Sequence, residues 1–156
     1  MRKTRAKKRP LLPDPRFNDP LVTRFVNNLM YDGKKSTAFT IFYDAIDIVS
    51  EKSGEANGLD QWKTALTNVM PHVEVRSRRV GGSTFQIPQQ IRPERKISMA
   101  MKWMIGYARS RNEKSMAAKL AGEIMAAAKE EGAAVKKRMD VHKMAEANKA
   151  FSHFRF

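Results

Sequence analysis

The sequence has no cysteine, which excludes disulfide bonds, thiolate metal ligands and thiol nucleophiles. The absence of disulfides is typical of reducing intracellular compartments. No run of about 18 apolar residues is present, so we expect no membrane-spanning helix. The basic N-terminus is not followed by an apolar segment, and it therefore does not resemble a secretory signal. The lack of cysteine fits an intracellular protein.

Catalytic motifs are missing as well. His72, His142 and His153 do not have the spacing of metal ligands. Neither a G-x-S-x-G nor a G-x-x-x-x-G-K motif occurs. The segment Gly81-Gly82-Ser83-Thr84 lacks the lysine and the strand–helix context of a phosphate-binding loop, so it is interpreted as a turn. The sequence predicts no enzyme, no cofactor and no metal site.

Positive charge is abundant. The 156 residues include 30 Lys and Arg against 16 Asp and Glu, which gives a net charge of +14 and a pI near 10.3. Such an excess of one sign repels itself, and its usual reason is a polyanionic partner. Nucleic acid is the first candidate, and an anionic membrane surface is the second.

The charge is unevenly distributed. Residues 1–16 carry a net +6, residues 71–96 carry +4 and residues 132–156 carry +4, whereas residues 17–70 carry −2. A basic footprint with several separate parts suits a large folded polyanion better than one short duplex site.

Apolar residues recur at helical spacing in six segments. Asp19-Pro20 begins the first and Gly33 ends it. The second covers about 36–51, the third 59–69 before Pro71, the fourth begins at Pro93, the fifth follows a capping box formed by Ser110 and Glu113, and the sixth covers about 133–149.

Between residues 72 and 90, the spacing of apolar residues changes from the helical period to an alternation of every second residue. Val73 and Val75 alternate with polar residues, and Gly81-Gly82 separates this run from a second one, which predicts a β-hairpin. Pro88 is expected to end or fray the second strand. Two strands do not form an independent sheet, so the hairpin should protrude as an arm. The expected fold is mainly α: a single bundle-like domain of six helices, 19–156, with this hairpin and an extended basic N-terminal arm, 1–18.

Each basic segment could bind nucleic acid or could simply be a solvated, charged surface. Arg76, Arg78 and Arg79 of the hairpin could contact phosphates with their planar guanidinium groups, or they could be solvated and only deter aggregation at the strand edges. The cations of the N-terminal arm bind phosphates or merely solubilise the chain.

The helix ends allow the same two interpretations. Arg92, Arg95 and Lys96 begin the fourth helix, where the helix dipole disfavours cations and a bound phosphate would relieve the conflict. Solvent and Glu94 could screen the same cost. Arg109 and Arg111, which lie between the fourth and fifth helices, contact nucleic acid or cap helix carbonyls.

The last helix and the C-terminus are basic and partly aromatic. Lys136, Lys137, Arg138, His142 and Lys143 form a basic face that either meets a partner or is solvated. The final residues, from Phe151 to Phe156, alternate aromatic and cationic groups and either stack on RNA bases or cover the bundle. Trp103 and Tyr107 are interpreted as packing residues.

Several motifs have a specific order along the chain. They are Pro13-Asp14-Pro15-Arg16-Phe17 with Asp19-Pro20; Asp32-Gly33-Lys34-Lys35; Arg78-Arg79-Val80-Gly81-Gly82-Ser83-Thr84-Phe85-Gln86-Ile87-Pro88; Arg92-Pro93-Glu94-Arg95; Lys136-Lys137-Arg138-Met139-Asp140; and His142-Lys143-Met144-Ala145-Glu146-Ala147-Asn148. Over nearly the whole chain, these motifs closely resemble the universal family of small-subunit ribosomal protein seven, in its bacterial type. The chain departs from the family at Gln89-Gln90-Ile91 and at the final Phe156.

The resemblance implies a structural ribosomal protein. It implies primary binding to the 3′ major domain of small-subunit (16S) rRNA, nucleation of head assembly, and a place near the exit-site tRNA and the mRNA exit path, beside head and platform proteins and away from any membrane. The ribosome would be that of a cytoplasm or an organelle. The resemblance and the charge pattern together give the residues expected to bind rRNA: Arg2, Lys3, Arg5, Lys7, Lys8, Arg9, Arg16, Lys34, Lys35, Arg76, Arg78, Arg79, Arg92, Arg95, Lys96, Arg109, Arg111, Lys136, Lys137 and Arg138. Of these, Lys96, Arg109 and Arg111 follow from the charge pattern alone. The residues expected on the tRNA side are Gly81, Gly82, Ser83, Thr84, His142, Lys143, Asn148, His153 and Arg155.

Two other functions remain open from the residues alone. A DNA architectural protein could place the hairpin in a minor groove, although the turn has no intercalating side chain and one groove does not meet every basic segment. An RNA-processing enzyme would need a nucleophile or metal cluster that the motifs do not supply.

Overall fold

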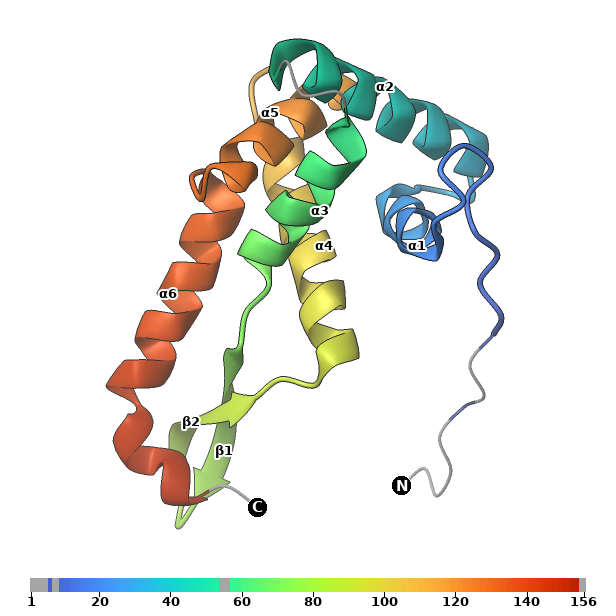
Figure 1. The fold of residues 1–156 in the computed structure, drawn as a ribbon. Helices are drawn as coiled ribbons and strands as arrows, with labels where there is room; N and C mark the ends of the chain where they lie inside the picture. The colour runs from blue at the N-terminus through green and yellow to red at the C-terminus, as the bar shows by residue number, and fades with distance from the viewer. Residues whose placement is uncertain (1–5, 7–8, 54–56, 155–156) are drawn as a thin grey trace.

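The computed structural model describes residues 6, 9–53 and 57–154 (Figure 1). Six α-helices are interrupted by one antiparallel hairpin and followed by a short 3-10 helix, so the expected mainly α architecture is confirmed. In chain order the elements are α1 (Pro20–Leu29), α2 (Lys35–Ser53), α3 (Gly58–Val69), β1 (Val73–Val80), β2 (Ser83–Gln90), α4 (Pro93–Arg109), α5 (Met116–Ala128), α6 (Ala133–Ala147) and η1 (Lys149–Phe154).

The core lies where α1–α5 meet, together with the start of α6. Phe25 of α1, Phe42 of α2 and Trp62 of α3 are fully buried. Their ring centroids are 5.3–5.5 Å apart, at tilted or edge-to-face angles that favour aromatic pairs. The predicted apolar stripes of α1–α5 therefore point inward. The stripe predicted for α6 is wrong beyond Val135, because Met139 and Met144 are exposed on the part of α6 that extends past the bundle core. Trp103 and Tyr107 pack against the same core, as the sequence predicted.

The start of α1 follows the predicted cap. The Asp19 carboxylate accepts a hydrogen bond from the Leu21 amide at 2.8 Å, and Pro20 occupies the first turn, where its missing N–H costs nothing. Asp19 also pairs with Lys63 of α3 at 2.7 Å. The cap therefore joins two helices as well as starting one.

The last five residues of the expected N-terminal arm fold against α2. The buried Asp14 carboxylate accepts hydrogen bonds from the amides of Arg16, Phe17 and Asp19 at 2.9–3.1 Å and from the Tyr43 hydroxyl at 3.1 Å. Burial opposes ionisation of this carboxyl group, but the four donors outweigh it and lower the pKa of Asp14. This carboxylate fixes the direction in which the chain enters α1.

The predicted capping box before α5 is wrong. Ser110 has helical backbone angles (φ −81°, ψ −4°) because it is the C-cap of α4, and an N-cap needs extended backbone. Ser115 caps α5 instead, accepting the Ala118 amide at 3.1 Å. The Glu113 side chain bonds Arg111.

The expected end of the second strand at Pro88 is also wrong, since β2 continues to Gln90. Gly81 and Gly82 both have positive φ, +57° and +89°, as a tight two-residue hairpin turn requires. Counting from that turn, Pro88 opposite Val75 falls at a position where the amide faces away from the partner strand. The strand therefore tolerates the missing N–H.

The hairpin and α2 lie at opposite ends of the molecule (Figure 1). From α5, α6 runs along one side of the molecule towards the hairpin and leads into η1, which packs on β2. The Phe85 and Phe151 ring centroids are 5.1 Å apart. The hairpin thus protrudes from the bundle, but the end of the chain supports it.

Candidate nucleic-acid interface

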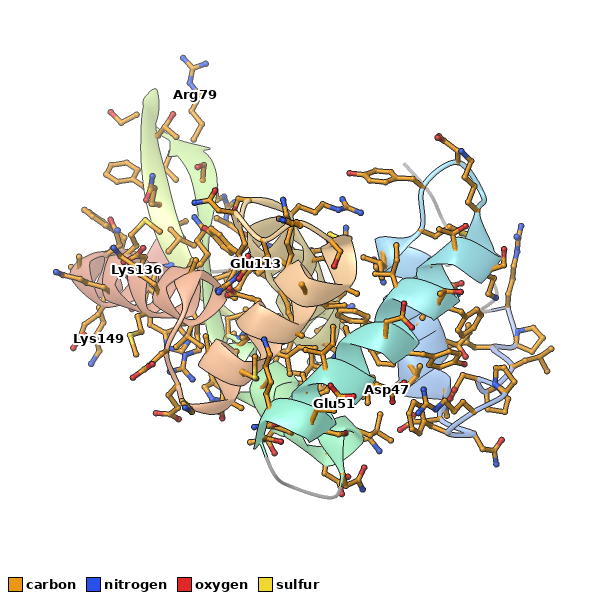
Figure 2. All side chains as sticks on the ribbon, turned by 90° about the horizontal axis from the view of Figure 1, so that it is seen from above. Asp47, Glu51, Arg79, Glu113, Lys136 and Lys149 are labelled. Atoms are coloured by element: carbon orange, nitrogen blue, oxygen red, sulfur yellow. The ribbon has the colours of Figure 1, made fainter. Side chains whose placement is uncertain are left out.

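The tip of the hairpin is polar and exposed. Arg79 lies beside the turn and points away from the rest of the molecule (Figure 2). Gly81, Gly82, Ser83 and Thr84 are all exposed, so the backbone itself is accessible there. A narrow two-stranded ribbon with an arginine at its tip can enter a groove of a folded nucleic acid.

The base of the hairpin is organised by a buried acid. Glu74 is 6% exposed; its Oε1 accepts from Nε and Nη2 of Arg76 at 2.7 Å, and its Oε2 accepts from Nε and Nη2 of Arg95 at 2.8 Å. Burial would raise the pKa of Glu74, but the bonds from Arg95 and Arg76 outweigh burial and lower it. The carboxylate therefore stays charged and orients both guanidinium groups.

These two arginines can still bind a second anion. Their side chains are 55% and 53% exposed, and the bonds to Glu74 use only Nε and Nη2. An arginine has five N–H donors, so the Nη1 group of each remains directed away from the carboxylate. The cluster of Glu74, Arg76 and Arg95 keeps a net positive charge at a fixed place.

A histidine pair joins α6 to the hairpin. The His72 amide donates to Nε2 of His142 at 3.0 Å, and Lys96 Nζ lies 3.3 Å from His72 Nδ1. Burial, followed by the charges of His72 and Arg138, lowers the pKa of His142. His142 therefore accepts the bond as a neutral ring and holds the first residue of the hairpin against α6.

The basic face of α6 has an inner and an outer part. Arg138 Nη1 donates to the Asn68 carbonyl at 2.5 Å, which ties α6 to the end of α3. Lys136 and Lys143 are exposed, and Lys137 is partly exposed. Arg138 has a structural role in this geometry, whereas the lysines face outward.

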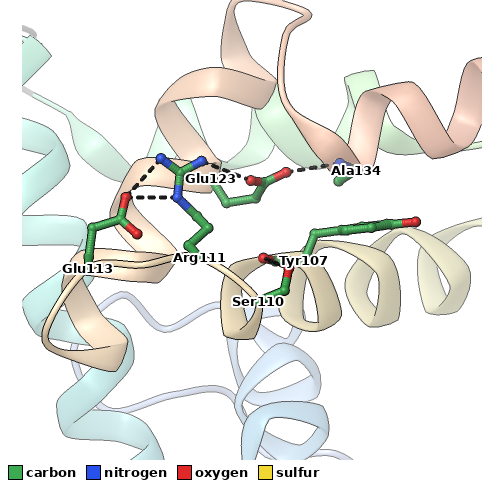
Figure 3. Close-up of polar contacts among 6 residues, drawn as sticks. All are labelled: Tyr107, Ser110, Arg111, Glu113, Glu123 and Ala134. Carbon is green, nitrogen blue, oxygen red and sulfur yellow. Dashed lines mark hydrogen bonds and ion pairs between the residues drawn. The ribbon is translucent and has the colours of Figure 1, made fainter.

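Arg111 is held within the protein (Figure 3). It contacts Glu113 at 2.8 Å and the fully buried Glu123 at 3.2 Å. Glu123 also accepts the Ala134 amide at 2.9 Å, so one carboxylate links the loop before α5 to the start of α6. Arg111 therefore has a structural role, but its partners are carboxylates and not the helix carbonyls of the alternative weighed from the sequence.

Arg109 and Arg16 also have partners within the fold. Arg109 Nη2 donates to the Leu29 carbonyl at 3.0 Å, and its guanidinium lies 4.0 Å from the Tyr31 ring centroid. Arg16 makes two bonds to Asp47, at 3.0 and 2.6 Å. Both arginines fix the arrangement of their own segments.

The other cations with described positions lie on the surface. Arg9, Lys34, Lys35 and Arg92 are exposed, and Arg78 projects from the exposed part of β1. The remaining predicted contacts lie outside the described residues: Arg2, Lys3, Arg5, Lys7, Lys8 and Arg155.

The residues expected on the tRNA side fall in two places. Four form the hairpin tip, and His142, Lys143, Asn148 and His153 lie in or after α6, up to η1. His142 and Asn148 bond within the protein, Asn148 to the Met144 carbonyl at 2.8 Å, while Lys143 and His153 are exposed. Because η1 packs on β2, the structure brings the C-terminal segment against the hairpin.

Comparison with known proteins decides the family. Residues 1–149 match the family of ribosomal protein S7p/S5e. The chain belongs to this family. The small ribosomal subunit protein uS7 of Flavobacterium psychrophilum is 81% identical to it, and that of Flavobacterium johnsoniae is 80% identical, each over 100% of both chains. The protein of that name from Cytophaga hutchinsonii is 69% identical over the same full coverage. The resemblance noted from the motifs is thereby confirmed.

Family members are structural proteins of the small ribosomal subunit. Across residues 9–53 and 57–154, His, Asp and Glu do not form any group of three that could hold a metal ion. In the same segments, no helix combines the length and apolarity needed to cross a bilayer.

Sequence reasoning missed the three buried acids of this ribosomal protein, Asp14, Glu74 and Glu123, and the exposed Tyr31. Glu74 offered a weak signal, since it is the only acid between Pro71 and Pro93 in a strongly basic segment. Glu123 offered another, since it interrupts the apolar face of α5. The arginine partners of Glu74 and Glu123 lie up to 21 residues away in the sequence, so no local pattern identifies these pairs.

Proposed function

We propose that this chain is a primary binder of the 3′ major domain of small-subunit rRNA and nucleates assembly of the subunit head. The family, the net charge of +14 and the distribution of cations support this role. One observation carries most weight: the hairpin and the basic side of α6 lie together, away from the acidic face of α2. Figure 2 shows Arg79, Lys136 and Lys149 on one side and Asp47 and Glu51 on the other.

The mechanism is neutralisation of phosphates by cations held in a fixed array. The acid at the hairpin base orients Arg76 and Arg95, and the bundle fixes their distance from the lysines of α6. Because the cations are already positioned, less conformational entropy is lost on binding than with flexible side chains. The array then holds separate RNA segments in one relation, which is what nucleation of a folded RNA requires.

The proposed tRNA side is the tip of the hairpin with η1. Its exposed backbone at Gly81 and Gly82 and the nearby His153 and Lys143 suit contact with a sugar–phosphate chain. This side would lie near the exit-site tRNA and the mRNA exit path, with head and platform proteins as neighbours. The N-terminal arm, 1–18, would extend along rRNA from the turn fixed by Asp14.

The chain would act without catalysis or a cofactor, in cytoplasmic ribosomes. The proposed roles of the cations differ with their surroundings. Arg111 and Arg138 position other groups, whereas the exposed Arg79, Arg92 and Lys136 and the partly exposed Lys137 contact RNA directly.

Binding to a 3′ major domain transcript tests the proposal. We expect log affinity to fall linearly with log salt, with a slope of about 0.9 for each duplex phosphate neutralised, so several contacts give a slope of several units. A slope near zero would contradict the proposal. Competition with duplex DNA at one salt concentration tests the architectural alternative, and preference for DNA would favour it.

A further inference from the structure

We propose that Tyr31 is a base-stacking residue, on which an unpaired rRNA base lies against a phenol ring that the fold holds ready. This inference rests on the proposed function and adds to it a site that reads a base face instead of a phosphate. Tyr31 lies in the connection between α1 and α2, remote in sequence from the hairpin and from α6.

The exposure of Tyr31 is unusual for this chain. Tyr31 is 64% exposed, whereas Phe39, Tyr43, Trp103 and Tyr107 pack against the core. Of the Phe, Tyr and Trp side chains that the structure describes, Tyr31 alone falls in the exposed class. A single exposed ring does not by itself require a partner, so the inference rests on how this ring is held and on the cations next to it.

The ring is nevertheless held in place. The Arg109 guanidinium carbon lies 4.0 Å from the centroid of the Tyr31 ring, a distance typical of cation–π stacking. Arg109 is fixed in turn by the bond from Nη2 to the Leu29 carbonyl, 3.0 Å long. The arginine covers part of the ring, and the large exposed fraction leaves aromatic surface for a second planar group.

The backbone around Tyr31 is also fixed. Asp32 and Gly33 both have positive φ, +51° and +73°, and the Lys34 amide donates to the Tyr31 carbonyl at 2.9 Å. Two consecutive residues in the left-handed region of backbone angles define a tight turn. A non-glycine residue such as Asp32 adopts these angles at some cost in free energy. The turn places Tyr31 next to Lys34 and Lys35, which are exposed.

This combination matches a nucleotide. The flat face of a base suits the ring, and the flanking phosphates suit Lys34 and Lys35; single-stranded RNA is bound by this pairing of stacking and charge. Arg109 contacts the ring, and Lys34 and Lys35 follow it in the same turn with one acid, Asp32, so the segment keeps a net positive charge. An apolar protein partner would not favour that surrounding charge.

Affinity for a 3′ major domain transcript of Flavobacterium johnsoniae small-subunit rRNA tests the inference. Tyr31→Leu keeps an apolar side chain but removes the aromatic face, and we expect affinity to fall by about 5-fold to 150-fold, the range of one base stack. The slope of log affinity against log salt should not change, because no phosphate contact is lost. Tyr31→Phe should bind within about 2-fold of the unmodified chain.

Lys34→Gln is the matched comparison in the same turn. It should reduce the salt slope by about 0.7–0.9, and its loss of affinity should shrink as salt rises. Arg109→Lys keeps the charge but removes the planar contact with the ring, so it should resemble Tyr31→Leu in leaving the slope unchanged.

Ultraviolet crosslinking of the unmodified chain to the same transcript gives a readout that needs no variant. We expect a crosslinked nucleotide on the tryptic peptide that contains Tyr31. If Tyr31→Leu has a lowered melting temperature, the crosslink replaces the affinity of that variant as the test. Absence of the crosslink would then overturn the inference.

The outcomes separate this inference from the function on which it rests. Weak, salt-independent binding by the unmodified chain would overturn the proposed function. Normal binding by the unmodified chain and equal binding by Tyr31→Leu would overturn only the stacking role. Equal RNA affinity with loss of Tyr31→Leu from assembled small subunits would assign Tyr31 to a protein neighbour and also overturn the inference.

Discussion

Buried acids decide the local geometry at the scale of single residues. Asp14, Glu74 and Glu123 are each at most 6% exposed, and each is surrounded by donors from separate segments. A buried carboxylate is tolerated only when hydrogen bonds replace its lost hydration. Glu74 and Glu123 orient the arginines that pair with them, whereas Asp14 holds backbone amides and the Tyr43 hydroxyl.

Glu123 gives a prediction for stability. Glu123→Ala removes the acceptor of both Arg111 and the Ala134 amide, and we expect the free energy of unfolding to fall by about 2–4 kcal/mol. Urea denaturation measures it. The exposed Glu146→Ala on α6 is the control and should stay within about 0.5 kcal/mol. Equal effects of the two substitutions would contradict the role assigned to Glu123.

Asp14 gives a prediction for pH dependence. Its pKa in the folded state is lowered, so it stabilises the fold fully above its unfolded pKa and loses that contribution as pH falls through the folded pKa. Between pH 5 and about pH 3, the unfolding free energy of the unmodified chain should therefore fall more steeply than that of Asp14→Asn. Identical pH profiles in urea titrations would refute this.

At the scale of helices and strands, contacts with neighbouring elements hold the hairpin in place. The hairpin is too small to be stable alone, and it is held by Glu74 and Arg95 at its base, by His142 of α6 at His72, and by η1 against β2. It is therefore a rigidly supported arm, whose orientation is set by the last part of the chain.

Phe151 tests that support. Phe151→Ala removes the ring that packs on Phe85 at 5.1 Å, and we expect faster amide hydrogen exchange in β2, with little change in α1–α5. The loss of one aromatic pair should lower the unfolding free energy by about 0.5–1.5 kcal/mol beyond the area lost. Ser152→Ala, an exposed change in η1, should leave exchange in β2 unaltered. Uniform acceleration across the bundle would point to general destabilisation instead.

Charge separation is the feature that matters at the scale of the whole molecule. The first half of the domain is slightly acidic, while the hairpin and the C-terminal segment carry most of the excess positive charge. The fold places these two basic segments together, although residues 97–131 of the chain separate them. One face of the molecule is therefore strongly positive.

Position, as opposed to total charge, should govern incorporation into ribosomes. A triple variant with Arg79, Lys136 and Lys137 changed to Gln should lose several units of salt slope at about 0.9 per contact and incorporate poorly into small subunits. A control with Lys52, Lys114 and Lys129 changed to Gln removes the same charge from other places. We expect it to incorporate normally in sucrose-gradient sedimentation. Similar defects in both variants would show that only net charge matters.

The sequence by itself determined the helices, the hairpin and the family. Helical spacing, the cap at Asp19 and the turn at Gly81-Gly82 depend on residues within one or two turns of each other, so they can be recognised locally. Only the tertiary structure decided which cations face outward. Arg95 meets Glu74, and Arg138 meets the Asn68 carbonyl, because the fold brings the start of α4 near β1 and packs α6 against α3. The predicted capping box at Ser110 is wrong because Ser110 is the C-cap of α4. Side-chain pairing across 21 or 70 residues depends on packing of the whole core, and no local pattern contains that information.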